Sequence, residues 1–269
     1  MIKTIALDLD NTLLNNNKEI SARNERVLKA LHAQGIHVVL CTGRPINAIW
    51  PYIEQLGLTT PNDYTITFNG GLVINNVTKE HLYEFGMSKD DLTPLLSYVN
   101  EKGIPLNVLD FDQVYELNDF PGSIYRTVLK NIHFENIATA DLPDKTFSKA
   151  VMAIPAEKLT PIIADLPDEL KTQYHAVQSQ PMIMEFLPLG VNKAAGLKVL
   201  LEHFGEDFSN LMTFGDADND LEMIEAAEQG IVMENGLPQV KAVATAITDS
   251  NENDGVATYC EQYFATQLK

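Results

Sequence analysis

The sequence predicts an α/β fold in which a doubly wound, mostly parallel sheet is interrupted by an inserted α+β domain. At both ends of the chain, short apolar runs typical of buried strands alternate with helical patterns. Strands that are separated by helices, without hairpin turns, pair in parallel through crossover connections. In the middle of the chain, strand-like runs instead follow one another closely. We therefore expect one sheet built from the two ends, with the middle forming a domain of its own.

Residues 1–81 form the first part of this predicted core. Apolar runs that predict buried strands lie at 5–7, 38–41 and 65–68. Ser21 is a candidate N-cap for a helix between the first two runs, and Gly35 would end that helix. Pro45 suits the first turn of a second helix, which Gly57 would close. This part therefore predicts strands that alternate with helices.

Residues 189–269 form the second part of the core and repeat this order. Asn192 can cap a helix that Gly205 ends. Runs at 211–214 and 230–233 predict two further strands with a helix between them. We expect these strands to join the sheet of the first part.

Residues 82–188 have the pattern of the inserted domain. Ser88, with Asp91 three residues later, forms a capping-box pattern before a helix. Strand-like runs follow at 105–109, 113–117, 149–154, 174–178 and 182–187. Because only a hairpin-sized gap separates the first two runs, we expect an antiparallel α+β domain here.

Composition excludes several classes of function. The 269 residues include 19 Lys plus Arg and 37 Asp plus Glu, a net charge of −18. Nucleic-acid binding and docking on an anionic membrane both need clustered basic residues, which the chain lacks. Two cysteines cannot form a disulfide framework or a Cys-rich zinc site. The chain has no apolar run long enough to span a membrane, and a carboxylate at position 8 comes too early for a secretory signal. We therefore expect a cytoplasmic protein. We also expect it to be a monomer or a weak homo-oligomer.

Polar residues follow four of the predicted strands. Asp8 and Asp10 come after the first strand, Thr42 after the second, Asn69 after the third and Asp216 after the run at 211–214. A single Asp after a strand is usually a helix cap, but ligands of open parallel sheets bind beyond the carboxyl ends of the strands. Four such ends therefore predict a binding site at this edge of the sheet.

The carboxylates at this edge predict a metal. If Asp8, Asp10 and Asp216 are adjacent, at least one pKa must rise unless a cation lies between them. Oxygen ligands without a nearby His or Cys pattern favour Mg²⁺. The segment that begins at Asp216 resembles an EF-hand loop, but Leu221 and Ala227 stand where that loop needs Gly and Glu.

The sequence also restricts the nucleophile. It contains no phosphate-binding G-x-x-x-x-G-K-[ST] or G-x-G-x-x-G pattern, no H-E-x-x-H pattern and no G-x-S-x-G elbow. An aspartate therefore remains as the candidate nucleophile. Such a nucleophile requires a metal, because the carboxylate and the phosphate repel each other, and a second carboxyl group to transfer protons. Asp8 and Asp10 have the spacing for this pair, because residues i and i+2 of an extended chain point to the same side.

Four motifs, in order, resemble those of the haloacid dehalogenase superfamily. They are D-L-D-N-T at residues 8–12, T-G-R at 42–44, Lys193 and G-D-A-D-N-D at 215–220. F-N-G-G at 68–71, Met223 and N-D-G-V-A at 253–257 further resemble its Cof-type sugar-phosphate phosphatases. The resemblance covers both core parts, and the insert has the size of that family's cap, the part that determines substrate specificity.

The resemblance implies a role for each matching residue. Asp8 would attack phosphorus, and Asp10 would protonate the leaving alcohol and then activate water. Mg²⁺ would be held by Asp8, the backbone carbonyl of Asp10 and Asp216. The resemblance assigns substrate binding to Thr42, Gly43, Lys193 and Asn219, and supporting roles to Arg44, Asn69 and Asp220.

Simpler interpretations stay open for several of these residues. Lys193 could be an ordinary surface lysine, Thr42 a strand-end cap, and Arg44 a partner in a surface salt bridge. Asn219 and Asp220 could be first-turn caps, and Asn69 with Gly70 could only make a tight turn. Two residues depart from the family pattern. Asn11 replaces a commoner Gly, and Ala194 stands where a Gly is usual after Lys193.

The resemblance implies a Mg²⁺-dependent phosphatase that acts on small phosphorylated metabolites, sugar phosphates in particular. The alternatives are a phosphosugar mutase and a regulatory phospho-acceptor that does not turn over. Residues 82–188 carry 8 basic and 16 acidic residues, and the remainder carries 11 and 21. Because both parts are acidic, a small-molecule monophosphate with a neutral body fits best as the substrate.

Overall fold

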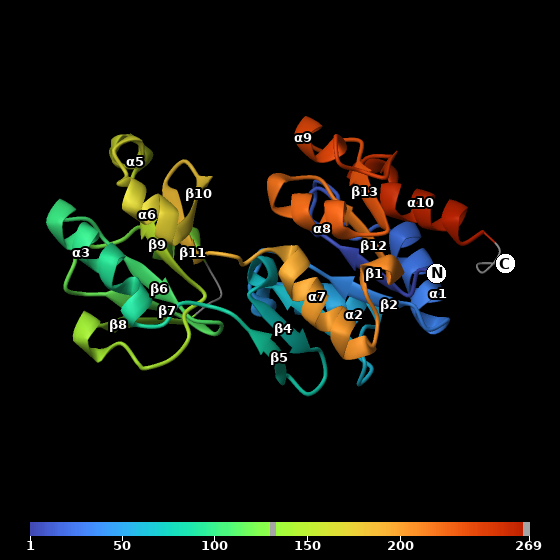
Figure 1. The fold of residues 1–269 in the computed structure, drawn as a ribbon, viewed down its shortest axis with the longest axis horizontal. Coiled ribbons are helices and arrows are strands. Elements are labelled where there is room, and N and C mark those ends of the chain that lie inside the picture. The colour runs from blue at the N-terminus through green and yellow to red at the C-terminus, as the bar shows by residue number, and fades with distance from the viewer. Residues whose placement is uncertain (130–132, 266–269) are drawn as a thin grey trace. The chain divides into compact units, whose positions relative to one another are not determined.

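The computed structural model describes residues 1–129 and 133–265, which divide into two compact units (Figure 1). Unit 1 joins Met1–Tyr83 to Asn192–Lys269, and unit 2 is Glu84–Val191. The boundaries expected after residues 81 and 188 lie within a few residues of these divisions. Within the described residues, no helix combines the length and apolar character needed to cross a bilayer.

A five-stranded parallel sheet forms the centre of unit 1, in the order β14-β13-β12-β1-β2. Its strands are β1 Thr4–Leu7, β2 His37–Leu40, β12 Leu211–Gly215, β13 Gln229–Met233 and β14 Ala246–Thr248. Thr4 of β1 lies opposite Leu211 of β12, so the two ends of the chain meet at the centre of the sheet. This confirms the expected parallel core.

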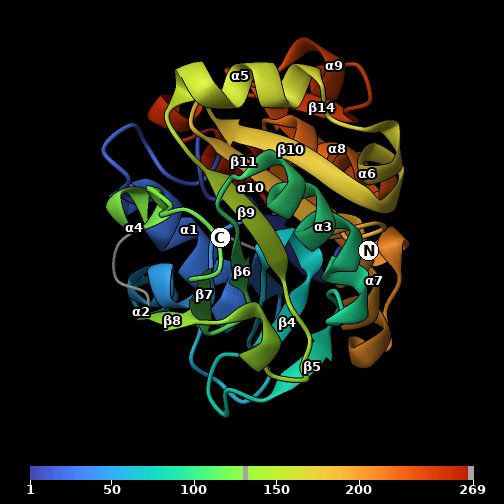
Figure 2. The same cartoon turned by 90° about the vertical axis from the view of Figure 1, so that its left-hand side faces the viewer.

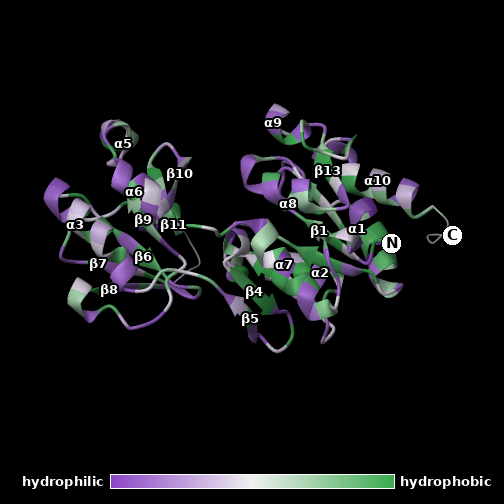
Figure 3. Ribbon diagram, in the orientation of Figure 1, coloured by the Kyte–Doolittle hydropathy of each residue, from purple (hydrophilic) through white to green (hydrophobic). Residues whose placement is uncertain are grey.

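Helices cover both faces of this sheet. They are α1 Ala22–Ala33, α2 Trp50–Leu56, α7 Lys193–Phe204, α8 Leu221–Ala226, α9 Pro238–Lys241 and α10 Gly255–Tyr263. The Thr213 hydroxyl donates to the Met223 carbonyl of α8, whereas the ring of Phe214 contacts Tyr259 of α10 edge to face. Because successive strand residues point to opposite faces, α8 and α10 lie on opposite sides of the sheet. The sheet is therefore doubly wound, and its strands are largely hydrophobic in Figure 3.

The helix ends of unit 1 follow the predicted signals with one difference. Ser21 and Asn192 cap α1 and α7 by accepting a backbone N–H, and Gly57 and Gly205 end α2 and α7 in the left-handed conformation. The helix expected from Pro45 begins only at residue 50, after a short 3-10 turn, Ile46–Ala48. The backbone at Ile49, with φ −123°, separates the turn from the helix.

Residues 64–84 contradict the expectation that the core parts contain no hairpin. Strands β3 Tyr64–Thr67 and β4 Leu72–Asn75 pair antiparallel, and β5 His81–Glu84 extends them to three strands. The reversal is possible because Asn69 and Gly70 have φ of 55° and 99°, the left-handed region that Asn and Gly tolerate. The amide of Thr42, which follows β2, still donates to the Ile66 carbonyl at 2.9 Å, so β3 continues the edge of the parallel sheet.

Unit 2 contains a six-stranded sheet in the order β10-β11-β9-β6-β7-β8 (Figure 2). Its strands are β6 Asn107–Leu109, β7 Gln113–Leu117, β8 His133–Ile137, β9 Lys149–Ala153, β10 Tyr174–Gln180 and β11 Ile183–Pro188. Its helices are α3 Thr93–Lys102, α4 Tyr125–Val128, α5 Ala156–Ala164 and α6 Asp168–Gln173. The expected hairpin of β6 and β7 and the Ser88–Asp91 capping box are both present.

Strand β8 was not expected, and it pairs with β7 in parallel, so the sheet of unit 2 is not purely antiparallel. It lies at the edge of the sheet, and its side chains are half-buried or exposed. Because an edge strand is not buried on both faces, β8 can contain polar residues. Its sequence therefore lacks the apolar run that predicts a central strand. The remaining strands bury a separate core, in which Phe147 and Phe186 are fully enclosed.

Candidate active site

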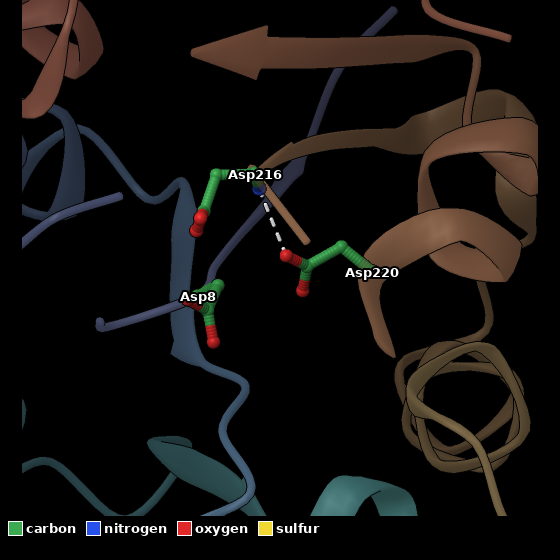
Figure 4. A group of neighbouring side chains, drawn as sticks. All are labelled: Asp8, Asp216 and Asp220. Carbon is green, nitrogen blue, oxygen red and sulfur yellow. Dashed lines mark hydrogen bonds between the residues drawn. The ribbon is translucent and has the colours of Figure 1, made fainter. Parts of the chain in front are cut away.

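Three carboxylates converge at the carboxyl ends of neighbouring strands in unit 1. Asp8 directly follows β1, Asp216 directly follows β12, and Asp220 lies one turn further along (Figure 4). One carboxylate oxygen from each lies within 4.8 Å of the others, and all three residues are buried. The structure thus brings Asp8 and Asp216 together at the sheet edge where the sequence predicts a site.

Lys193 is the cation of this cluster. Its Nζ lies 2.5 Å from Oδ1 of Asp8 and 2.6 Å from Oδ1 of Asp220. The side chain is completely buried, which excludes the surface-lysine interpretation. Burial at a helix N-terminus disfavours a cation. The charges of Asp220 and Asp8 nevertheless outweigh burial and hold the pKa of Lys193 above its usual value.

Asp220 is fully engaged in holding the cluster together. Its Oδ2 accepts the backbone N–H groups of Asp216 and Ala217 at 2.8 and 3.0 Å, while its Oδ1 binds Lys193. A Cβ on Gly215 would lie 2.6 Å from the Cβ of Asp220, so this approach requires glycine. Asp220 therefore positions Lys193 and the loop after β12, which is more than the capping role considered from the sequence.

Thr12 is a site residue that the sequence reasoning did not single out. Its hydroxyl donates to Oδ1 of Asp216 at 2.9 Å in a buried contact. The sequence contained a signal for Thr12, because this residue is the last of the D-x-D-x-T motif at residues 8–12. Thr12 links this segment to the loop after β12.

Asp220 takes the place in this cluster where the sequence predicts Asp10, and two of the three carboxylates have raised pKa values. Burial, with the charges of Asp220 and Asp216, raises the pKa of Asp8 to about 7 despite the opposing Lys193. Burial also raises the pKa of Asp216 to about 6, although the Thr12 hydrogen bond opposes it. One ammonium group therefore does not compensate three buried carboxylates, and the cluster needs further positive charge to ionise fully.

The donor set fits a hard divalent cation. Lys193 contacts Oδ1 of Asp8, and Thr12 contacts Oδ1 of Asp216, which also has Asn11 as a hydrogen-bond partner. Asp220, in contrast, has both oxygens occupied. An oxygen-rich site with uncompensated negative charge is the environment that Mg²⁺ prefers. Asp8 and Asp216 are thus the carboxylates that could hold a metal at this site.

A group of polar residues lies at the ends of β2 and β3. The Thr42 hydroxyl accepts the Arg44 amide at 3.1 Å, so Thr42 caps its turn but keeps its own proton to donate. Asn219 donates from Nδ2 to Oδ1 of Asn69 at 3.1 Å. A Cβ on Gly43 would lie 2.9 Å from that Oδ1, so glycine lets the Asn69 amide approach. The structure therefore groups Thr42, Gly43, Asn69 and Asn219.

Asp10 lies in a different environment from Asp8. Arg44 donates to both of its oxygens, from Nε at 2.7 Å and from a terminal nitrogen at 2.6 Å. Lys18 adds a third contact at 2.7 Å. Burial acts to raise the pKa of Asp10, but these hydrogen bonds hold it below its ordinary value. Arg44 thus forms the ion pair considered from the sequence, and Lys18, in an exposed loop without a recognisable motif, was missed.

A close contact between two glycines fixes the helix that carries Lys193. A Cβ on Gly70 would lie 2.0 Å from the Asn192 carbonyl oxygen, and a Cβ on Gly196 would lie 3.0 Å from the Cα of Gly70. The approach of α7 is therefore made through Gly196. Ala194, the departure noted in the sequence, does not prevent it.

The chain is similar to several known proteins. Residues 5–259 match the model of a family described as haloacid dehalogenase-like hydrolase. A Bacillus subtilis (strain 168) protein named "Putative phosphatase YxeH" is 34% identical over 264 residues, covering 96% of each chain. The 5-amino-6-(5-phospho-D-ribitylamino)uracil phosphatase YitU of the same organism is 29% identical and covers 97% of each chain.

Among solved structures, a haloacid dehalogenase-like hydrolase from Bacteroides thetaiotaomicron has a TM-score of 0.83 and 32% identity. That alignment covers 98% of this chain and 100% of the other. The match therefore extends over both units. The chain belongs to the haloacid dehalogenase-like hydrolase family and is an enzyme of that hydrolase class.

Proposed function

We propose that this enzyme is a Mg²⁺-dependent phosphatase that hydrolyses small phosphorylated metabolites, sugar phosphates in particular, through an aspartyl phosphate on Asp8. The observation that carries the proposal is the buried contact of Asp8 with Lys193, next to a second buried carboxylate, Asp216. Two similar proteins named as phosphatases support it.

Asp8, Asp216 and the backbone carbonyl of Asp10 would hold Mg²⁺ in this proposal. When bound, the ion supplies the positive charge that lets an anionic phosphoryl group approach an ionised aspartate. Lys193 provides the remaining compensation through its contact with Asp8. The raised pKa values of Asp8 and Asp216 support this assignment, because a nearby cation would return both groups to the ionised form.

The chain's own residues then account for both half-reactions. In the first, the Asp8 carboxylate forms a bond to phosphorus, the bond from phosphorus to the alcohol oxygen breaks, and Asp10 gives that oxygen a proton. In the second, Asp10 takes a proton from water as the water attacks phosphorus, which releases inorganic phosphate and restores Asp8. The hydroxyl of Thr42, the backbone of Gly43 and the amide of Asn219 would bind phosphoryl oxygens.

Unit 2 would supply the selectivity for the rest of the substrate. It has its own sheet and core, so its surface can vary without disturbing the carboxylates of unit 1. Acidic residues outnumber basic ones in both units. A substrate with one phosphate and an uncharged body avoids this repulsion, and sugar monophosphates are of this kind.

The test is phosphate release from p-nitrophenyl phosphate and from a panel of phosphorylated sugars, with Mg²⁺ and with EDTA. We expect hydrolysis that EDTA abolishes and that Asp8→Asn lowers at least about 1000-fold, as for loss of a nucleophile. Asp168→Asn, at an exposed position of unit 2, is the matched control and should retain full activity.

Other results would replace the proposal. Phosphate moved between positions of a sugar without release would indicate the mutase. A stable acyl phosphate without turnover would indicate the regulatory phospho-acceptor. Activity that survives EDTA or Asp8→Asn would exclude a Mg²⁺-dependent reaction through an aspartyl phosphate on Asp8.

A further inference from the structure

Asp10 is held by contacts that the proposed mechanism does not use. Arg44 and Lys18 together direct three N–H groups at its carboxylate, two to Oδ1 and one to Oδ2. These residues come from different segments, because Arg44 follows β2 and Lys18 lies in the loop before α1. Two cations on one partly exposed carboxylate exceed what neutralisation of its charge requires.

Tyr52 connects the two cations. Its hydroxyl donates to the backbone carbonyl of Lys18 at 3.0 Å, and its ring centroid lies 5.8 Å from the guanidinium carbon of Arg44. Tyr52 belongs to α2, so a helix supports both partners of Asp10. Asp10, Arg44, Tyr52 and Lys18 thus form a closed ring of contacts, which we call the Asp10 clamp.

The loop conformation of Lys18 belongs to the same arrangement. Lys18 has φ 63°, a left-handed conformation that is uncommon for residues other than glycine. The turn that contains it is fixed by Asn15, whose carbonyl accepts the Lys18 amide at 2.9 Å and whose side chain accepts the Asn17 and Glu19 amides. The ammonium group is therefore presented to Asp10 by a defined turn and not by a free loop.

The hydrogen bonds leave one place for a proton. A carboxylate has about four acceptor positions, two on each oxygen. The Asp10 clamp occupies both positions on Oδ1 and one on Oδ2. The remaining position is on Oδ2, so this atom is the one available to a leaving oxygen or to a water molecule.

We propose that Arg44, Lys18 and Tyr52 are positioning residues that orient the Asp10 carboxylate and leave Oδ2 as the atom that passes the proton. The inference rests on the proposed function, in which Asp10 is the general acid and base. The ion pairs of the clamp are partly exposed and contribute little to stability. Removing a clamp residue should therefore affect proton transfer much more than folding.

The test compares p-nitrophenyl phosphate with phenyl phosphate. The two esters have nearly the same shape, but phenolate is the more basic leaving group and depends more on a proton from Asp10. We expect Arg44→Met to lower kcat/KM for phenyl phosphate roughly 10 to 100 times more than kcat/KM for the nitrophenyl ester, as we also expect of Asp10→Asn. Lys18→Met should give a smaller selective loss, and Tyr52→Phe the smallest.

Matched controls separate positioning from general damage. Lys29→Met and Tyr263→Phe alter a lysine and a tyrosine outside the clamp and should leave the ratio of the two kcat/KM values unchanged. Thermal unfolding should show that the clamp variants remain folded. An equal loss of kcat/KM for both esters would overturn the clamp, because it would show a structural or binding role.

The result also distinguishes the clamp from the proposed function beneath it. If Asp10→Asn is selective for phenyl phosphate but the clamp variants are not, only the clamp is wrong. If Asp10→Asn itself is not selective, or the unaltered enzyme hydrolyses neither ester, the role of Asp10 and the clamp are both wrong.

Discussion

Asp8 and Asp10 are two residues apart, yet their carboxylates have opposite electrostatics. Around Asp8, the ammonium of Lys193 faces three buried carboxylates, and the pKa of Asp8 is raised. Around Asp10, two cations face one carboxylate, and its pKa is lowered. Burial acts to raise both values, so the local ratio of cations to carboxylates decides the sign. Within one short segment, the surroundings of Asp8 thus have too few cations, and the surroundings of Asp10 have more cations than carboxylates.

The largest effect is expected from removing the cation of the buried cluster around Asp8. Lys193→Met keeps the length of the side chain but leaves Asp8 and Asp220 without their partner. We expect a loss of roughly 3–5 kcal/mol in the free energy of unfolding at pH 7, the usual cost of breaking a buried ion pair. Urea denaturation measures it. A loss no larger than that of Lys18→Met would show that burial does not distinguish the two clusters.

Adding a cation to this cluster should stabilise the protein in a pH-dependent way. In metal-free protein, the folded-state pKa of about 7 for Asp8 and about 6 for Asp216 lies above the ordinary value of 3.8. The stability that these groups contribute is therefore fully present below about pH 4 and is lost as the pH rises through about 6 and 7.

Mg²⁺ should reverse that loss. We expect the rise in melting temperature caused by saturating Mg²⁺, relative to EDTA, to be several degrees larger at pH 8 than at pH 5. Differential scanning fluorimetry at the two pH values checks this, with Asp216→Asn as the variant that should lose the effect. An equal rise at both pH values would contradict the assignment of Asp8 and Asp216.

The smallest effect is expected at Asp10. Its lowered pKa contributes stability that is present above its ordinary value and is lost as the pH falls through the folded value. Arg44→Met should therefore cost roughly 0.5 kcal/mol at pH 7, since the pair is partly exposed, and less as the pH approaches about 3. Urea denaturation over this range measures the trend, and a cost that grows toward acid would refute it.

The sequence was informative where a residue follows a strong apolar run. Asp8 and Asp216 come directly after buried strands, so their meeting at one sheet edge could be predicted from strand order alone. Lys193 is different, because 185 residues separate it from Asp8. From the sequence, only the resemblance to a family includes Lys193 among the site residues.

Other features depended on tertiary contacts that no local pattern records. The hairpin after β3 requires Gly70 to pack against the Asn192 carbonyl, far along the chain. Strand β8 is a polar edge strand, and Lys18 reaches Asp10 only through the conformation of its own turn. Tyr52 resembles any half-buried helix residue until its hydroxyl is seen on the Lys18 carbonyl.

The pairing of β1 with β12 has a consequence for how the protein is made. During translation, β1 and β2 leave the ribosome long before β12, their partner at the centre of the sheet, has been synthesised. At about 5–20 residues per second, the delay is on the order of 10 to 30 seconds. All of unit 2 is made in that interval, and its separate core allows it to fold first. The nascent N-terminal segment meanwhile exposes an unpaired strand edge, which leaves this enzyme open to aggregation until its last third emerges.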